Sequence, residues 1–243
     1  MGTDHTERAA APPQGTPRFT RENVDRFRVR PLKESRSVVG PDVWLLECDG
    51  ERFVLKDFRH RAWLFRNTWG RIAVSRETAA YGLLAGVPGV PRLAARLDPF
   101  GFVMEFKEGS ILPPRSGRAE LGMEFFDALN DVVGVMHDRG VAHGDLRRKN
   151  ILVDAQRRPV LLDFETATIR RDRWFSRRFF RMIQRVDRLK VLKIKHKYFT
   201  LRSTPEEIAQ LENPPWYLRA GRFLRRSLYA PIKARRREED EDD

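Results

Sequence analysis

The segment 141–167 constrains this chain most, because it sets polar side chains at fixed intervals around short apolar runs. His143 and Asp145 precede Asn150, and the pair Asp163-Phe164 follows thirteen residues after that asparagine. The apolar runs 150–154 and 159–164 are separated by a polar turn, which predicts a small β-hairpin. The segment therefore combines a hairpin with carboxylate and amide groups that suit catalysis or metal binding.

The spacing H-x-D-x4-N followed by D-F resembles the catalytic and metal-binding segments of the protein-kinase-like superfamily. Phosphoryl transfer needs a carboxylate that accepts the proton of an incoming hydroxyl, and hard oxygen ligands for the Mg²⁺ that bridges the ATP phosphates. The resemblance implies that Asp145 is the base and that His143 braces the loop. It also implies that Asn150 and Asp163 are the metal ligands, with ATP and Mg²⁺ as cofactors.

A second match lies upstream. The runs 43–48 and 52–58 flank Asp49-Gly50 and predict a β-hairpin with a tight turn. Residues 71–85 predict a helix with Ala73, Glu77, Ala80 and Leu84 on one face. The resemblance implies that Lys56, at the end of the second strand, holds the α- and β-phosphates and needs a helix carboxylate. Glu77, in the middle of the predicted helix, is the candidate. The alternative is that both are ordinary solvent-facing charges.

Residues 103–109 resemble the hinge that borders the adenine pocket in this superfamily. The resemblance implies that the backbone from Glu105 to Lys107 bonds the adenine edge, with Met104 beside the pocket. A buried strand with a polar exit explains the same residues. The turn 34–42 has one glycine, Gly40, where the family's phosphate-covering loop has more. The complete set of ATP-binding residues implied is Lys56, Gly40, Val54, Met104, Glu105, Lys107 and Leu152.

The departures from the pattern point to one branch of the superfamily. Glu165 replaces the glycine after Asp163-Phe164, no A-P-E follows, and H-G-D-L stands in place of H-R-D. Over residues 27–215 the chain resembles the minimal kinases, namely the RIO-type kinases and the lipopolysaccharide (Kdo and core heptose) kinase family. The fold implied is α+β and bilobal, with a β-rich N-lobe carrying one helix and a truncated, mainly helical C-lobe.

The predicted organisation follows composition and periodicity. The stretch 119–140 is an amphipathic helix whose buried side holds Phe125, Leu129, Val132, Val133 and Met136, and Gly140 ends it. The run 204–207, with a threonine cap, a proline at the first helical position and an acid at the third, predicts the start of another helix. Pro, Thr, Gly and Ala dominate the first residues, which predicts a disordered leader. The predicted parts are a leader (1–24), an N-lobe (25–106), a C-lobe (107–215), a basic amphipathic helix (216–237) and an acidic tail (238–243).

The charge of the chain is strongly positive, with 47 Lys and Arg against 34 Asp and Glu, a net charge of +13. Twelve of the basic residues fall between Arg170 and Lys197, which favours an anionic partner. In that stretch Phe175, Phe179, Met182 and Val186 keep helical spacing, which predicts the core face of a helix. The segment 216–237 is either a helix bound to an acidic membrane surface or one docked on the C-lobe.

Composition also excludes several classes. No apolar stretch approaches the ~20 residues that span a bilayer, and no secretory signal is visible. A single cysteine, Cys48, excludes a disulfide framework. We therefore expect a cytoplasmic protein, with peripheral contact at the inner membrane face through 216–237.

The function expected is an ATP- and Mg²⁺-dependent kinase. Its partners are ATP and an anionic acceptor, and the leading acceptor is a sugar hydroxyl on an anionic glycolipid of the lipopolysaccharide-core type. One alternative is a RIO-like protein serine/threonine kinase, in which case the acceptor is a protein. Another is a pseudokinase or nucleic-acid-binding module, although we do not expect nucleic acid as a partner.

Overall fold

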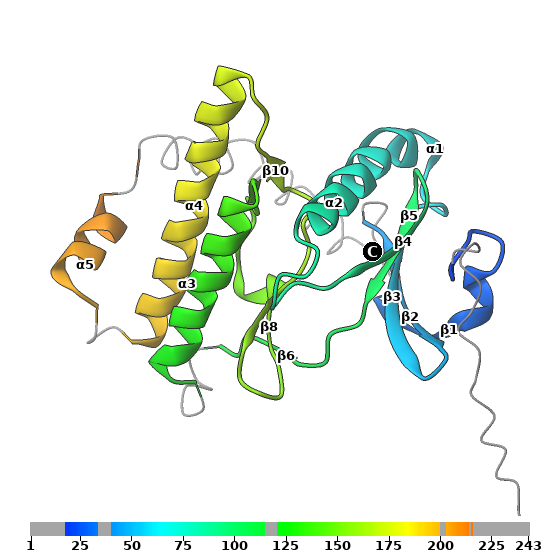
Figure 1. Cartoon of the computed structure of the whole chain (residues 1–243), viewed down its shortest axis with the longest axis horizontal. Coiled ribbons are helices and arrows are strands. Elements are labelled where there is room, and N and C mark those ends of the chain that lie inside the picture. The colour runs from blue at the N-terminus through cyan, green and yellow to red at the C-terminus, as the bar shows by residue number, and fades with distance from the viewer. Residues whose placement is uncertain (1–17, 34–39, 115–120, 200–202, 214, 216–243) are drawn as a thin grey trace, which may run out of the picture. The chain divides into compact units, whose positions relative to one another are not determined.

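A computed structural model describes residues 18–33, 40–114, 121–199, 203–213 and 215. The chain forms two compact units. Unit 1 runs to Thr78 and takes in Leu93–Phe106, while unit 2 takes in Ala79–Arg92 and the chain from Lys107 onward. Strands dominate unit 1 and helices dominate unit 2, which confirms the expected α+β class (Figure 1).

Unit 1 is built on an antiparallel sheet with the strand order β1-β2-β3-β5-β4. Its strands are β1 (Arg28–Lys33), β2 (Asp42–Cys48), β3 (Glu51–Asp57), β4 (Leu93–Asp98) and β5 (Gly101–Glu105). The predicted hairpin is confirmed. Asp49 and Gly50 join β2 to β3 with φ of 52° and 73°, the positive values that a tight two-residue turn requires. This turn fixes a register in which Lys56 lies opposite Val43.

The first described residues pack against the sheet. Phe19 is 2% exposed and forms edge-to-face contacts with Phe27 and Phe53, and Val24 begins a 3-10 helix (Val24–Phe27) with its side chain buried. Residues 18–24, which composition assigned to the leader, therefore belong to unit 1. Their role was hidden because single apolar residues between charges give no periodic signal.

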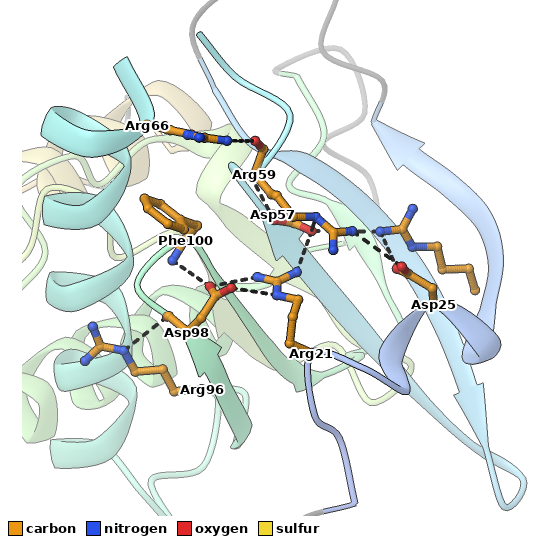
Figure 2. Close-up of polar contacts among 9 residues, drawn as sticks. Arg21, Asp25, Asp57, Arg59, Arg66, Arg96, Asp98 and Phe100 are labelled. Carbon is orange, nitrogen blue, oxygen red and sulfur yellow. Dashed lines mark hydrogen bonds and ion pairs between the residues drawn. The ribbon is translucent and has the colours of Figure 1, made fainter. Parts of the chain in front are cut away.

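A cluster of charged side chains, of which Asp57 is buried and Arg21 and Asp98 are half-buried, ties this N-terminal segment to two strand ends (Figure 2). Arg21 donates to both carboxylate oxygens of Asp98, at 2.6 and 2.7 Å, and to Asp57 at 2.7 Å. Burial alone would raise the pKa of Asp98. The hydrogen bond and charge of Arg21, together with the backbone N–H groups of Phe100 and Gly101, hold that pKa below its ordinary value.

The helical stretch after the hairpin begins with α1 (Trp63–Phe65), continues through a π-helical turn (Arg66–Gly70) and becomes α2 (Arg71–Leu83). Ala73, Glu77, Ala80 and Leu84 are all buried, so the predicted face is confirmed. Gly86, with φ 76°, follows the end of the helix. The helix starts in unit 1 and ends in unit 2.

Unit 2 packs helix against helix, with small strand pairs between. Figure 1 shows α3 (Met123–Asp138, green) and α4 (Trp174–Tyr198, yellow) side by side, with α5 (Pro205–Glu212) against α4. The strands β6 (Ser110–Ile111), β8 (Ile151–Val153) and β9 (Pro159–Leu161) form one sheet, and β7 (Val141–Ala142) pairs with β10 (Thr168–Ile169). The hairpin expected over 150–164 is therefore present.

The buried side of α3 matches the prediction except at Val132, which is only half-buried, and Gly140 follows the helix with φ 80°. Thr204 begins α5 with a complete capping box to Glu207, as its sequence predicts. Glu207 also binds Lys195 on α4 at 2.8 Å.

The predicted core face of α4 is wrong. Phe175 and Phe179 are 67% and 51% exposed, while the buried side carries Phe180, Asp187, Val191, Ile194 and Tyr198. Phe179 and Phe180 are adjacent, so two different faces of this helix have apolar residues at helical spacing. The face that carries Phe180 is the one that packs against α3 and is buried. The segment 216–237 and the acidic tail lie outside the described residues.

Candidate active site

Lys56 and Glu77, predicted from separate elements, meet in unit 1. Lys56 lies on β3 and Glu77 on α2, and Nζ is 2.6 Å from Oε1. The two side chains are only 12% and 2% exposed, so neither is an ordinary surface charge. Glu77 is buried among the apolar residues of α2, where an unpaired carboxylate would be costly. The pair therefore fixes the end of the Lys56 side chain.

His143 and its neighbours form a rigid loop in unit 2. The His143 ring is fully buried, 4.8 Å from the ring of Phe164, and its Nε2 lies 3.0 Å from the carbonyl oxygen of Leu162. A carbonyl only accepts, so Nε2 carries the hydrogen and Nδ1 is left to accept from the backbone N–H of Asp145 at 3.4 Å. The predicted bracing role of His143 is consistent with these contacts.

Asp145 and Asn150 lie within hydrogen-bond reach of one another. The Asn150 side-chain amide donates to the backbone carbonyl of Asp145 at 2.9 Å and to its Oδ2 at 3.5 Å. The same Oδ2 is 2.9 Å from Nε of Arg147. The Asp145 side chain is 37% exposed, so it is positioned by its neighbours and still open to a substrate.

Asp163 stands beside Asn150 in the hairpin register. Asn150 precedes β8 and Asp163 follows β9, and the pairing of Ile151 with Leu161 puts both at the same end of the hairpin. Asp163 has φ 69°, a left-handed conformation that is uncommon outside glycine and that concentrates at functional sites. The backbone N–H of Leu162 donates to the Asn150 carbonyl at 2.9 Å and closes this end.

Asp187 is the main site residue that the sequence analysis missed. Its carboxylate is fully buried and accepts hydrogen bonds from the backbone N–H groups of His143 (2.7 Å) and Gly144 (2.9 Å). His137 on α3 donates from Nε2 to the same group at 3.1 Å. A signal did exist, because Asp187 shares helical spacing with Phe180, Val191 and Ile194. Arg147, which contacts Asp145, was also missed.

The other predicted ATP-binding residues are distributed over both units. Val54 and Met104 pair across β3 and β5, and their side chains are 6% and 5% exposed. Glu105 ends β5 and Lys107 follows it, and both are half-buried. The remaining two are Gly40, with φ 119° before β2, and Leu152, which is buried on β8. Most of the turn 34–42 lies outside the described residues.

The side-chain oxygens of Asn150 and Asp163, at one end of the hairpin, suit a hard cation as metal ligands. Because the Asn150 amide nitrogen points at Asp145, its amide oxygen is left to accept on the other side. Together with the Asp163 carboxylate, this gives the amide and carboxylate oxygens that Mg²⁺ takes in phosphoryl-transfer sites. Within the described residues no cluster of three or more His, Cys, Asp or Glu forms an all-protein metal cage, so substrate phosphates and water would complete the coordination.

The sheet with its buried Lys–Glu pair, and the helical unit with its braced loop and hairpin, define an α+β protein with a kinase-like fold. Residues 119–211 match the model of the lipopolysaccharide kinase (Kdo/WaaP) family. The match covers His143, Asp145, Asn150, Asp163 and Asp187. Lys56 and Glu77 lie outside it.

A curated relative supports the same class. An 81-residue segment is 38% identical to "CBL-interacting protein kinase 16" of Oryza sativa subsp. japonica, over 32% of this chain. The chain covers 18% of that protein's length. Together the two matches show similarity to the protein-kinase-like superfamily and support a phosphotransferase. In the described part of the chain, no helix is both long and apolar enough to span a membrane.

Proposed function

We propose that this chain transfers the γ-phosphate of ATP to a hydroxyl acceptor. The observation that carries the proposal is the loop 143–150, whose base candidate Asp145 and ligand candidate Asn150 are joined by hydrogen bonds inside a segment that matches a kinase family. The buried pair of Lys56 and Glu77 supports the proposal independently, because a fixed ammonium group suits the α- and β-phosphates of a nucleotide.

Each residue then has one task. Asp145 orients the acceptor hydroxyl and takes its proton as phosphoryl transfer proceeds. Asn150 and Asp163 would hold Mg²⁺, which would supply positive charge to neutralise the ATP phosphates. Lys56, fixed by Glu77, positions the α- and β-phosphates. His143 holds the loop in place. The sequence resemblance assigns Val54, Met104 and Leu152 to the purine, the backbone of 105–107 to its edge, and Gly40 to the phosphates.

The acceptor we propose is a sugar hydroxyl on an anionic glycolipid of the lipopolysaccharide-core type. The family model matched by residues 119–211 is named for lipopolysaccharide kinases, and an acidic acceptor complements the positive charge of the chain. We further propose that the protein is cytoplasmic and acts at the inner membrane face. Contact through 216–237 remains a prediction from the sequence.

The second candidate acceptor is a protein serine or threonine hydroxyl, as in RIO-type kinases. The observation that favours it is the similarity to "CBL-interacting protein kinase 16". A third possibility, a pseudokinase or nucleic-acid-binding module without turnover, predicts no transfer to either acceptor. The first two functions differ in where the phosphate goes, and the third differs from both in transferring none.

The test is to incubate the full chain with Mg²⁺ and ATP carrying a labelled γ-phosphate, together with membranes that contain lipopolysaccharide precursors. We expect label in the glycolipid fraction, and none with Asp145→Asn. Label in protein bands instead would favour the second acceptor. If neither fraction is labelled and Mg²⁺ with ATP fails to raise the melting temperature, the kinase proposal is wrong.

A further inference from the structure

The first turns of α4 carry three aromatic side chains that are largely exposed in the described part of the chain. Trp174, Phe175 and Phe179 are 60%, 67% and 51% exposed, and the rings of Trp174 and Phe175 are in contact. Soluble proteins rarely gather large apolar side chains on one surface unless a partner covers them. This cluster is therefore a candidate interaction surface.

The rest of the exposed side of α4 is uniformly basic. The only acid in α4 is Asp187, which is buried against the loop 143–150, so no carboxylate of this helix offsets the positive charge. With 25 residues, α4 is roughly 37 Å long, and exposed basic side chains occur along most of that length. The exposed cations are Arg177, Arg178, Arg181, Arg185, Arg188, Lys190, Lys193 and Lys197.

A cavity lies where α4 meets α5. Its volume is about 680 Å³, and its polar lining consists of Arg181, Arg185 and Arg188 with the side-chain amides of Gln184, Gln210 and Asn213. No acid lines it. Several guanidinium groups around one hollow suit a phosphate-bearing group, because each offers paired donors to phosphate oxygens.

We propose that the exposed side of α4 docks on the surface of an anionic lipid bilayer. Tryptophan and phenylalanine settle at the boundary between headgroups and acyl chains, and basic side chains are attracted to acidic headgroups. Trp174, Phe175 and Phe179 would enter that boundary, and the arginine-lined cavity would take a headgroup phosphate. The surface is distinct from the proposed active site, so this proposal does not depend on the kinase assignment.

Single-stranded nucleic acid is the competing ligand for aromatic and basic side chains together. Its binding sites interleave aromatics with cations along one groove, so that successive bases stack. On α4 the exposed aromatics are confined to the first turns and none of them lines the arginine cavity. Trp174 and Phe175 also stack on each other, which occupies ring faces that a base would need. The arrangement favours a lipid surface.

The test is co-sedimentation of the full chain with vesicles, without ATP. We expect binding to phosphatidylcholine vesicles that contain phosphatidylglycerol, weak binding to pure phosphatidylcholine, and loss of binding at high salt. Arg181→Gln/Arg185→Gln should weaken binding about 30-fold, since each arginine near an acidic surface contributes roughly five-fold. Trp174→Ser/Phe175→Ser should weaken it by about tenfold or more.

Matched controls come from unit 1. Trp63→Ser/Leu64→Ser removes apolar side chains that are 69% and 68% exposed, and Arg26→Gln/Arg30→Gln removes two exposed arginines. We expect both control variants to bind vesicles like the parent. The proposal is overturned if the α4 variants bind like the parent, or if the control variants lose as much. It is also overturned if the α4 substitutions weaken binding to a single-stranded oligonucleotide but leave binding to vesicles unchanged.

Discussion

The carboxylate of Asp187 accepts a hydrogen bond of 2.7 Å from the backbone N–H of His143, a residue 44 positions away in the sequence. A second bond from Gly144 and a third from His137 use the same buried group. The loop that carries Asp145 is therefore held by a helix far along the chain. Its geometry depends on how α4 packs and not on local sequence alone.

Replacing Asp187 with Asn should loosen this loop and destabilise unit 2. The amide keeps the size of the side chain but turns one acceptor into a donor that faces backbone N–H groups. We expect a loss of about 3 kcal/mol in the free energy of unfolding, measured in urea. Asp172→Asn, at an exposed aspartate just before α4, should change it by less than about 0.5 kcal/mol. If the two substitutions lowered the free energy of unfolding equally, Asp187 would not be the residue that holds this loop.

Asp145→Asn should abolish phosphoryl transfer and leave nucleotide binding largely intact. The substitution removes the base but keeps a side chain that still contacts Asn150. A fall in turnover of about 10²-fold or more is expected, with an unchanged Kd for ATP by isothermal titration calorimetry. Asp138→Asn, at an exposed site on α3, serves as the matched control. Turnover near the parent value in Asp145→Asn would mean that another residue is the base.

The pair of Lys56 and Glu77 should act as one unit. Lys56→Met leaves a buried carboxylate without its partner, and Glu77→Gln releases the lysine from its position. We expect each change to lower the rate of phosphoryl transfer. In a double-mutant cycle, the loss in the double variant should be smaller than the sum of the two single losses by a coupling energy of about 1 to 3 kcal/mol. Strictly additive losses would show that the 2.6 Å contact does not couple their functions.

The ion pair of Arg21 with Asp98 should make stability depend on pH at the acidic end (Figure 2). The pKa of Asp98 is lowered in the folded chain, so the pair stabilises the fold above about pH 4, the range of a free aspartate, and loses its effect as pH falls through the lowered value. Asp98→Asn should cost about 1 to 2 kcal/mol at pH 7 and progressively less below pH 4.

The control for this measurement is Asp49→Asn. Asp49 forms an exposed ion pair with Arg18 at 3.1 Å and has an 82% exposed side chain. Surface pairs of this kind contribute little, so its loss should be about 0.5 kcal/mol or less at pH 7. A cost for Asp98→Asn that stays constant from pH 7 to pH 3 would rule out the linkage.

Local sequence was sufficient for the elements whose signals are short-range. The Asp49-Gly50 turn, the face of α2 and the capping box of α5 each depend on neighbours within a few residues, and each is present as predicted. The spacing of His143, Asp145, Asn150 and Asp163 also identified a kinase-like segment, because the hairpin between the last two leaves little freedom in their separation.

Tertiary packing decided what short-range patterns leave open. Phe179 and Phe180 are adjacent in a helix, so either could face the core, and contacts with α3 bury Phe180. Asp187 looks like one acid among arginines until the fold brings the His143 backbone to it. Arg21 gains two acidic partners only when the sheet forms. In each case the deciding partner lies far away in sequence, and burial sets the energy of the contact.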